Sequence, residues 1–100
     1  MSQPVYMLFQ ARWTEAWYQL SNEEQQQMLA RVGGALEQVG GKTMLMCNSA
    51  WANEEFLFFG VEEYPDIEAA QRHSALLADL NWYRYVESKS MLGTSMMGDS

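Results

Sequence analysis

The sequence predicts an α+β domain whose elements follow the order β-α-β-β-α-β. Three observations predict it: short apolar runs rich in strand-forming residues, two longer segments with helical periodicity, and a capping residue at the start of each longer segment. A chain of 100 residues, 48% of them hydrophobic, has the size of one domain with its own core. We therefore expect a single domain over 1–100, with an ordered core near 4–92 and a flexible tail at 93–100.

The first half of the chain predicts one strand and one long helix. Residues 5–9 read Val-Tyr-Met-Leu-Phe, a run typical of a strand that is covered on both faces. A short helical turn is expected within 13–20. Residues 21–24 read Ser-Asn-Glu-Glu, which is a capping box, and apolar residues at helical spacing follow it. A helix over 22–39 is therefore expected, and it should end at Gly40 because glycine readily adopts the left-handed conformation that closes a helix.

The second half predicts two strands, a helix and a final strand. The two strands are expected at 43–48 and 55–62, the latter around the run Phe-Leu-Phe-Phe. An aspartate cap opens a helix over 66–80, whose apolar residues keep to one face and which should end at Asn81. The last strand is expected at 82–92.

This order of elements is that of the ferredoxin-like fold, in which a four-stranded antiparallel sheet carries two helices on one face. The expected order of the strands across the sheet is 4-1-3-2, so the first and third strands are central. These are also the most apolar strands of the sequence, which supports the assignment.

The sheet face that the helices leave bare is expected to be apolar as well. An apolar patch of this size is typical of an interface, so we expect a homodimer packed through this face. A monomer that binds a peptide or lipid there is the alternative. The side chains assigned to the helix side are Val5, Met7, Phe9, Leu57, Phe59 and Val61. Those assigned to the bare side are Tyr6, Leu8, Gln10, Met44, Met46, Phe56, Phe58, Tyr83 and Tyr85.

The element order and the two-faced apolar strands resemble the dimeric α+β barrel superfamily. More narrowly, Trp17 with 20–24, then Gly40-Gly41, and finally 82–87 (Trp-Tyr-Arg-Tyr-Val-Glu) are similar to a small bacterial family of unknown function within it. The resemblance implies two ferredoxin-like protomers that share a barrel, with a pocket in each. It does not imply one reaction, because the superfamily includes cofactor-free monooxygenases, haem-degrading enzymes, isomerases and proteins with no known activity.

His73 is the first candidate for chemistry, because it lies in the middle of the apolar stripe of the second helix. One interpretation is a neutral core imidazole that is hydrogen-bonded inside the protein, which predicts a pKa below the usual value. The other is a residue that reaches a pocket as a base or as a haem ligand. Haem-degrading members of the superfamily use an asparagine, a tryptophan and a histidine, and Asn48, Trp51 and His73 match these types. Asn48, however, lies on the wrong strand for that pattern.

A second group of candidates lies at the end of the first strand and on the last strand. Aromatic walls with a few polar groups suit a planar, phenolic or polyketide-like ligand, and the alternative is plain packing in a dimer core. Arg12 or Arg84 could hold an anionic ligand. The candidate pocket residues are Gln10, Trp13, Trp17, Phe56, Phe58 and Tyr83, and the catalytic candidates besides His73 are Arg12 and Tyr85.

Composition excludes several other functions. Cys47 and His73 are the only cysteine and histidine, so no internal disulfide and no Cys/His metal site is expected, and the single thiol favours a reducing, cytoplasmic location. Six basic against 13 acidic residues give a net charge of −7, which disfavours nucleic acid. No apolar run approaches the ~20 residues of a membrane span, so no membrane partner is expected.

Two functions of different classes are therefore open. One is a small-molecule site, such as a cofactor-independent monooxygenase or isomerase that acts on a small aromatic ligand. The other is a non-catalytic dimeric module whose barrel is filled by side chains. An enclosed cavity of several hundred Å³ would favour the first, and side chains that fill the barrel interior would favour the second.

Overall fold

The computed structural model describes residues 3–97. Within this range the chain forms four strands, three α-helices and one 3-10 turn. In chain order they are β1 (Val5–Trp13), α1 (Glu15–Tyr18), α2 (Asn22–Gln38), β2 (Lys42–Asn48), β3 (Phe58–Tyr64), α3 (Ile67–Asp79), η1 (Trp82–Arg84) and β4 (Val86–Gly93).

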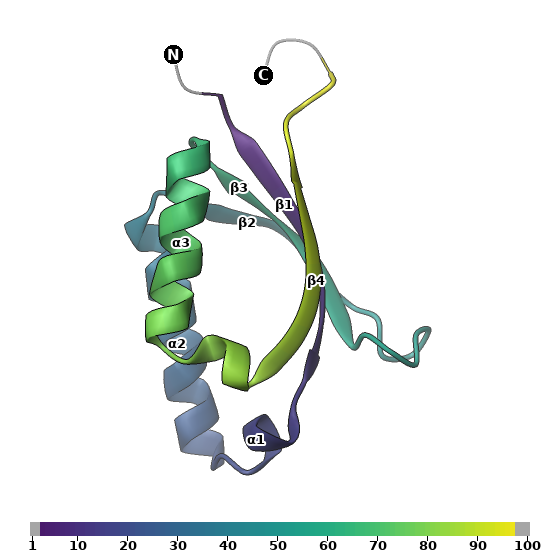
Figure 1. The fold of residues 1–100 in the computed structure, drawn as a ribbon. Coiled ribbons are helices and arrows are strands. Elements are labelled where there is room, and N and C mark those ends of the chain that lie inside the picture. The colour runs from purple at the N-terminus through teal and green to yellow at the C-terminus, as the bar shows by residue number, and fades with distance from the viewer. Residues whose placement is uncertain (1–2, 98–100) are drawn as a thin grey trace.

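The strands form one antiparallel sheet in the order β2-β3-β1-β4. Helices α2 and α3 both lie on the concave side of this sheet, and the opposite side carries no helix (Figure 1). The architecture is ferredoxin-like α+β, and the expected strand order is confirmed. Strands β1 and β3 are central, as the apolar pattern predicted.

The helix ends follow the capping residues. Ser21 caps α2, because its side chain accepts from the backbone N–H of Glu24 while its own N–H donates to the Glu24 carboxylate at 2.9 Å. Asp66 caps α3 in the same way, accepting from a backbone N–H of the first turn at 2.8 Å. Gly40 and Asn81 follow the two helices with φ of 78° and 59°, in the left-handed region. Both expected stops are confirmed.

Three strands differ clearly in length or position from expectation, and the first of them, β1, runs to Trp13 rather than to residue 9. The third strand covers 58–64 rather than 55–62, because Asn53 binds the backbone N–H groups of residues 55 and 56 in a turn. The last strand begins at residue 86 rather than 82, because residues 82–84 form η1 directly after left-handed Asn81. Of the expected flexible tail, 94–97 contains no helix or strand, and 98–100 lies outside the described residues.

The strand pairing also corrects the expected faces of the third strand. Phe58 lies opposite Ala11, and Glu62 opposite Met7, on the face that the helices cover. Alternate residues of a strand point to opposite faces, so the expected assignment of side chains to the two faces of the sheet is wrong by one residue along β3. The side chains facing the helices are Phe58, Glu62 and Tyr64, and those facing away are Phe59, Val61 and Glu63.

Three further residues expected on the bare face lie elsewhere. Met46 pairs with Gly60, and Gly60 also pairs with Phe9, which faces the helices. Met46 is therefore on the helix side. Tyr83 and Tyr85 precede β4 and take no part in the sheet. The bare face is therefore less aromatic than expected.

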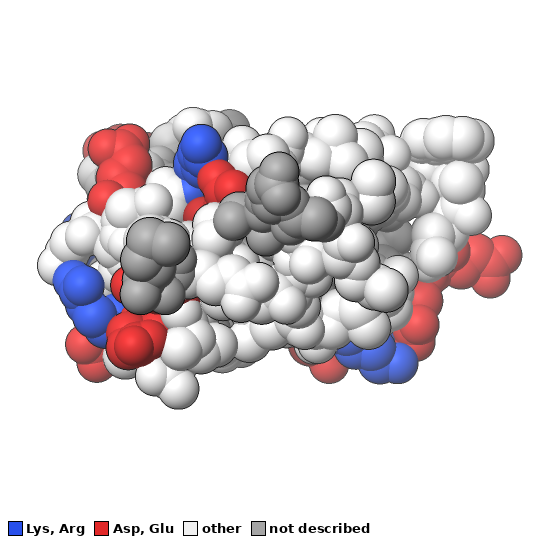
Figure 2. Space-filling model, turned by 90° about the horizontal axis from the view of Figure 1, so that it is seen from above, with Lys and Arg blue, Asp and Glu red and all other residues white. Residues whose placement is uncertain are grey.

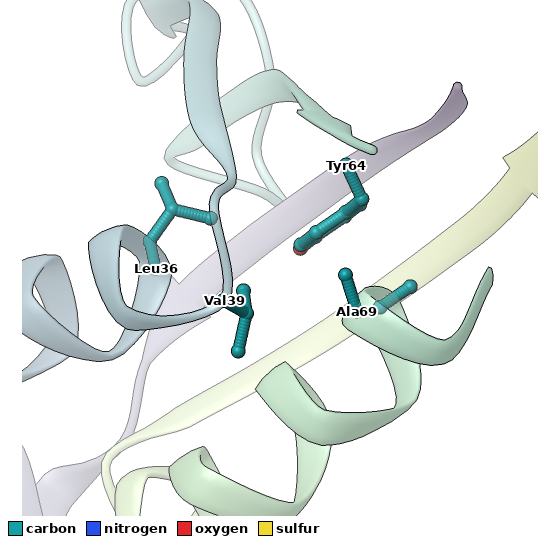
Figure 3. Close-up of a cluster of buried hydrophobic side chains, with 5 residues drawn as sticks. Leu36, Val39, Tyr64 and Ala69 are labelled. Carbon is teal, nitrogen blue, oxygen red and sulfur yellow. The ribbon is translucent and has the colours of Figure 1, made fainter. Parts of the chain in front are cut away.

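The close-packed core lies where β3 ends between the C-terminus of α2 and the N-terminus of α3. Tyr64 is 1% exposed at its centre, and Leu36, Val39 and Ala69 surround it (Figure 3). A side chain at Gly41 would meet Leu36 and Tyr64, which shows how closely the chain passes here. The helices are thus anchored to the sheet at one end, and the space towards Trp13 is less filled.

Candidate functional site: a cavity between the helices and the sheet

A cavity of about 860 Å³ lies between the sheet and the helices. Side chains of all four strands form its floor, α2 and α3 form its roof, and η1 contributes to one end. Most of the lining side chains are apolar or aromatic. The lining includes Trp13, Trp17, Val32, Asn48, Phe58, Glu62, His73, Trp82, Tyr83, Ser88 and Ser90.

One end of the cavity is an aromatic wall made of Trp13, Trp17, Phe58 and Trp82. The rings of Trp13 and Trp17 are stacked with centroids 4.1 Å apart. Trp82 meets both of them edge-on, at 5.9 and 6.1 Å, and Phe58 lies 5.0 Å from Trp13. Such pairs contribute about 0.5–1.5 kcal/mol each beyond their burial. The wall is therefore a rigid apolar surface against which a flat ring can stack.

The other end of the cavity carries a polar triad, which we define as Glu62, Tyr64 and His73; Glu62 and His73 line the cavity, and Tyr64 lies behind them. The hydroxyl of Tyr64 donates to Glu62 Oε1 at 2.7 Å and lies 2.8 Å from His73 Nδ1. His73 is only 3% exposed. Its second ring nitrogen, Nε2, is buried and has no hydrogen-bond partner among residues 3–97. A buried polar atom without a partner is uncommon and points to a role in binding.

Burial shifts the pKa of all three members of the triad. Desolvation lowers the pKa of His73, which keeps its imidazole neutral, and the expectation of a depressed pKa agrees with this direction. Desolvation raises the pKa of Glu62, although the hydrogen bond from Tyr64 opposes the change. The pKa of Tyr64 is strongly raised, first by burial and then by Glu62, so its hydroxyl keeps its proton.

The charges around the cavity are one-sided. Glu62 is the only acidic residue among its lining residues, and no lysine or arginine of the described part of the chain lines it. Arg12 instead lies on the opposite face of the sheet, where it pairs with Glu87 at 3.3 Å. Arg84 is exposed on η1 and does not line the cavity. The cavity therefore offers nothing that would pair with an anionic ligand, contrary to one expectation for these arginines.

The structure brings together five of the nine candidate residues and separates the other four. Trp13, Trp17, Phe58, Tyr83 and His73 all line the cavity. The other four lie outside it: Gln10 and Arg12 point to the bare face, Phe56 is buried with Lys89 Nζ 5.8 Å from its ring centre, and Tyr85 packs edge-on against Trp17.

Glu62 and Tyr64 are site residues that the sequence reasoning missed. Both stand at alternate positions of β3, so they share the face that the helices cover. The available signal was a glutamate two residues after a buried glycine in an apolar strand, which is an unusual place for a charge.

The residues considered for haem fit that group poorly. Asn48 and His73 line the cavity, but Trp51 is 84% exposed in the β2–β3 loop and does not. His73 Nδ1 is already engaged by Tyr64. Nothing in the lining would neutralise acidic substituents of a porphyrin, because no basic side chain of residues 3–97 reaches it. The three residue types therefore do not form one site here.

The bare side of the sheet, which we call the outer face, has an apolar centre with charged ends. Leu8 pairs with Val61 and Met91 across the strands at its centre. The Arg12–Glu87 pair lies at one end, and Lys42–Glu63, 3.2 Å apart, lies at the other. Seen from above rather than onto this face, the molecule has charged side chains towards its two ends and uncharged residues between them (Figure 2). An apolar centre with a polar rim is the usual composition of a protein interface.

The sequence matches one family model, described as a family of unknown function (DUF6616), over residues 6–99. No curated protein matches the sequence significantly. None of the helices in the described part of the chain has the length and apolar character needed to cross a membrane.

Several solved structures share the fold. A protein provisionally assigned as a chlorite dismutase superposes with a TM-score of 0.72 at 17% identity, covering 94% of this chain and 46% of its own. The hydroxynitrile lyase of Passiflora edulis gives 0.61 at 10% identity, covering 100% of both chains. A dimeric ferredoxin-like protein of unknown function from Thermobifida fusca gives 0.51 at 13% identity, covering 95% and 93%. This chain thus spans less than half of the first protein, and at identities this low the superpositions show a shared ferredoxin-like fold alone.

Proposed function

Because the chain belongs to the family of unknown function DUF6616, we propose a function from its own residues: it binds a small aromatic molecule in the cavity and acts on it without a cofactor. The observation that carries the proposal is the cavity of about 860 Å³, with an aromatic wall at one end and an unpartnered buried nitrogen of His73. Concave, mostly apolar pockets with a few convergent polar groups are the usual form of a small-molecule site.

The reaction class that suits this site is an isomerisation or oxygenation that begins with proton removal. His73 offers a neutral imidazole, which is the usual general base near neutral pH. The hydroxynitrile lyase among the fold neighbours is an enzyme, so the fold is compatible with catalysis. The alternative, a non-catalytic module with a filled barrel, requires side chains to occupy the space that the cavity takes up.

A cavity-filling substitution tests ligand binding. Val32 lines the cavity from the middle of α2, so Val32→Trp should occupy much of it without disturbing the capped ends of the helix. Gln27→Trp is the matched control, because Gln27 is exposed on the same helix and does not line the cavity. The probe is 2-naphthol, followed by quenching of tryptophan fluorescence.

We expect saturable quenching in the wild type and in Gln27→Trp, and loss of at least tenfold in affinity in Val32→Trp. Circular dichroism would confirm that both variants fold. Equal affinity in the two variants would place the probe elsewhere and contradict the proposed site. Absence of saturable binding in the wild type would contradict the proposed ligand class.

We further propose that the protein is a homodimer through the outer face. The apolar centre of this face, its ion-paired rim and the dimeric ferredoxin-like neighbour support the proposal. Leu8 is 41% exposed at the centre, so Leu8→Glu should be tolerated by a protomer but should place unpaired charges in the interface. Ile67→Glu is the control, because Ile67 is exposed to a similar extent, 44%, on the helix side.

Sedimentation analysis at micromolar concentration distinguishes the outcomes. The wild type and Ile67→Glu should sediment as dimers, and Leu8→Glu as a folded monomer. A monomeric wild type, or a dimeric Leu8→Glu, would rule out this interface.

A further inference from the structure

We propose that the polar triad makes the cavity a proton-acceptor site for neutral molecules: His73 Nε2 takes a proton from an acidic O–H or C–H group of the ligand, and Tyr64 and Glu62 hold His73 in the tautomer that can do so. This inference rests on the proposed function, because it requires a ligand in the cavity. It adds the atom that reacts, the residues that position it and the chemical class of the ligand.

The direction of the hydrogen bonds fixes the tautomer. The Tyr64 hydroxyl donates to Glu62 Oε1, and while that carboxylate is ionised it can only accept. That hydroxyl has one proton, so it can only accept from His73 Nδ1, 2.8 Å away. Nδ1 therefore carries the imidazole proton, and Nε2 is left with a free lone pair. Nε2 is also the nitrogen that no described residue satisfies.

The triad is assembled from two elements, β3 and α3, which pack against each other. Glu62 and Tyr64 stand at alternate positions of β3, and His73 enters from α3 on the opposite wall. Tyr64 is also the centre of the core between the two helices, so its hydroxyl has little freedom to turn away (Figure 3). Tyr64 does not line the cavity and acts on the ligand only through His73, so it is a positioning residue. Glu62 holds the Tyr64 hydroxyl and also lines the cavity.

The proton transfer balances within the site. The X–H bond of the ligand breaks, its electron pair stays on X, and a new N–H bond forms at Nε2. The ligand becomes an anion and His73 an imidazolium, whose charge is offset by the carboxylate of Glu62 through Tyr64. An isomerisation is completed when the same proton returns to a different atom of the ligand. No oxidant or further reactant is needed for this step.

The charges of the cavity select the class of ligand. Tyr64 contacts His73, the other titratable groups that line the cavity are Glu62, Tyr83, Tyr18 and Cys47, and none of these groups is a cation. A ligand that arrives as an anion would meet the Glu62 carboxylate without a compensating charge. A neutral phenol or enol instead offers the hydrogen-bond donor that Nε2 lacks. Flat apolar parts of the same molecule can stack on the aromatic wall.

The tautomer can be observed directly because His73 is the only histidine in the chain. With 15N-labelled histidine, NMR spectra at pH 8 should show Nε2 as the nitrogen without a proton in the wild type. In Glu62→Gln the side-chain amide can donate to the Tyr64 hydroxyl as well as accept from it. Tyr64 can then donate to His73 Nδ1, and a mixed or reversed population of the two imidazole tautomers is expected. Glu63→Gln is the control, because Glu63 is the next glutamate of β3 and points to the outer face. A wild-type spectrum with the proton on Nε2 would overturn the inference.

Three ring compounds of similar size separate this inference from the proposed function. Naphthalene tests the cavity alone, 2-naphthol adds a donor, and 2-naphthoate adds a negative charge. We expect 2-naphthol to bind at least tenfold more tightly than 2-naphthoate, and Glu62→Gln to weaken 2-naphthol at least fivefold while leaving naphthalene unchanged.

The possible failures are distinct. If naphthalene and 2-naphthol bind equally and neither responds to Glu62→Gln, the cavity is a ligand site but the proton-acceptor inference is wrong. If 2-naphthoate binds as tightly as 2-naphthol, the ligand class is wrong. If none of the three compounds binds, the proposed function itself fails.

Discussion

Replacing His73 by leucine should remove much of the acid sensitivity of the fold. His73 is 3% exposed and its pKa is lowered by desolvation, so the unfolded chain binds a proton at this residue more readily than the folded chain. The stability that the neutral histidine contributes is therefore complete above a pH of about 6.5, the usual value in an unfolded chain. It is lost as the pH falls from there through the lowered pKa of the folded state.

The size of this effect follows from linkage. Each unit by which burial lowers the pKa corresponds to about 1.4 kcal/mol of stability lost on acidification. A domain of this size has a free energy of unfolding of about 5–15 kcal/mol, so one unit is readily measurable. At pH 7.5 we expect His73→Leu to lie within about 1 kcal/mol of the wild type. The reason is that Tyr64 keeps its bond to Glu62, and the variant no longer buries Nε2 without a partner.

The contribution of Glu62 titration to the pH dependence of stability must be separated from that of His73, because burial raises the pKa of Glu62. The folded state then binds a proton at Glu62 more readily than the unfolded state, so acidification through this range stabilises the fold and opposes the histidine. The assay is urea unfolding between pH 7.5 and 5 for the wild type, His73→Leu, Glu62→Gln and the double variant. Since no other histidine is present, parallel stability curves for wild type and His73→Leu between pH 7 and 5.5 would refute the reasoning.

Three stability changes follow from other parts of the fold, and thermal or urea unfolding measures each of them. Gly33→Ala and Gly34→Ala should each raise the free energy of unfolding by up to about 1 kcal/mol, because a Cβ at either position of α2 would meet nothing within 4 Å. A decrease would show that these glycines do more than interrupt a helix. Gly60→Ala should destabilise the fold by about 1–3 kcal/mol, because its Cβ would lie 2.7 Å from the Leu45 carbonyl and 2.8 Å from the ring of Phe9. Unchanged stability would mean that β3 and its neighbours move apart without cost to make room for the Cβ. Ser21→Ala should cost about 1 kcal/mol through loss of the capping box, and a neutral result would show that the cap is redundant.

Local signals explain why the order of elements could be predicted. The capping box at Ser21, the aspartate cap at Asp66 and the left-handed stops at Gly40 and Asn81 all act within a few residues of themselves. Their effect does not depend on the rest of the fold, so the sequence alone indicates where the helices begin and end.

The faces of β3 could not be predicted in the same way. Residues 56–59 read Phe-Leu-Phe-Phe, a run without alternation, so nothing in it shows which residues point inward. The pairing with β1 decides this, and a shift of one residue exchanges the two faces. For this reason Phe58 was expected on the bare face and lies in the cavity, whereas Phe59 was expected inside and lies on the outer face.

The candidate site was predictable only in part, for a related reason. His73 could be recognised because a histidine interrupts an apolar stripe on a helix, which is a local pattern. Its partners Tyr64 and Glu62 stand 9 residues and more away along the chain, and only the packing of α3 on β3 brings them together. Gln10 was expected both on the bare face and in the pocket, and Arg12 was a catalytic candidate near Trp13; the alternation of β1 turns both to the outer face.

The most direct test of the account is an NMR titration of the protein, carrying 15N-labelled histidine, with 2-naphthol. We expect the signal of His73 Nε2 to shift and to saturate as the ligand binds. The signal of Nδ1 should change little, because Tyr64 already occupies that nitrogen. Saturable binding, seen by tryptophan fluorescence, without any change at Nε2 would contradict the central claim that this buried nitrogen faces the ligand.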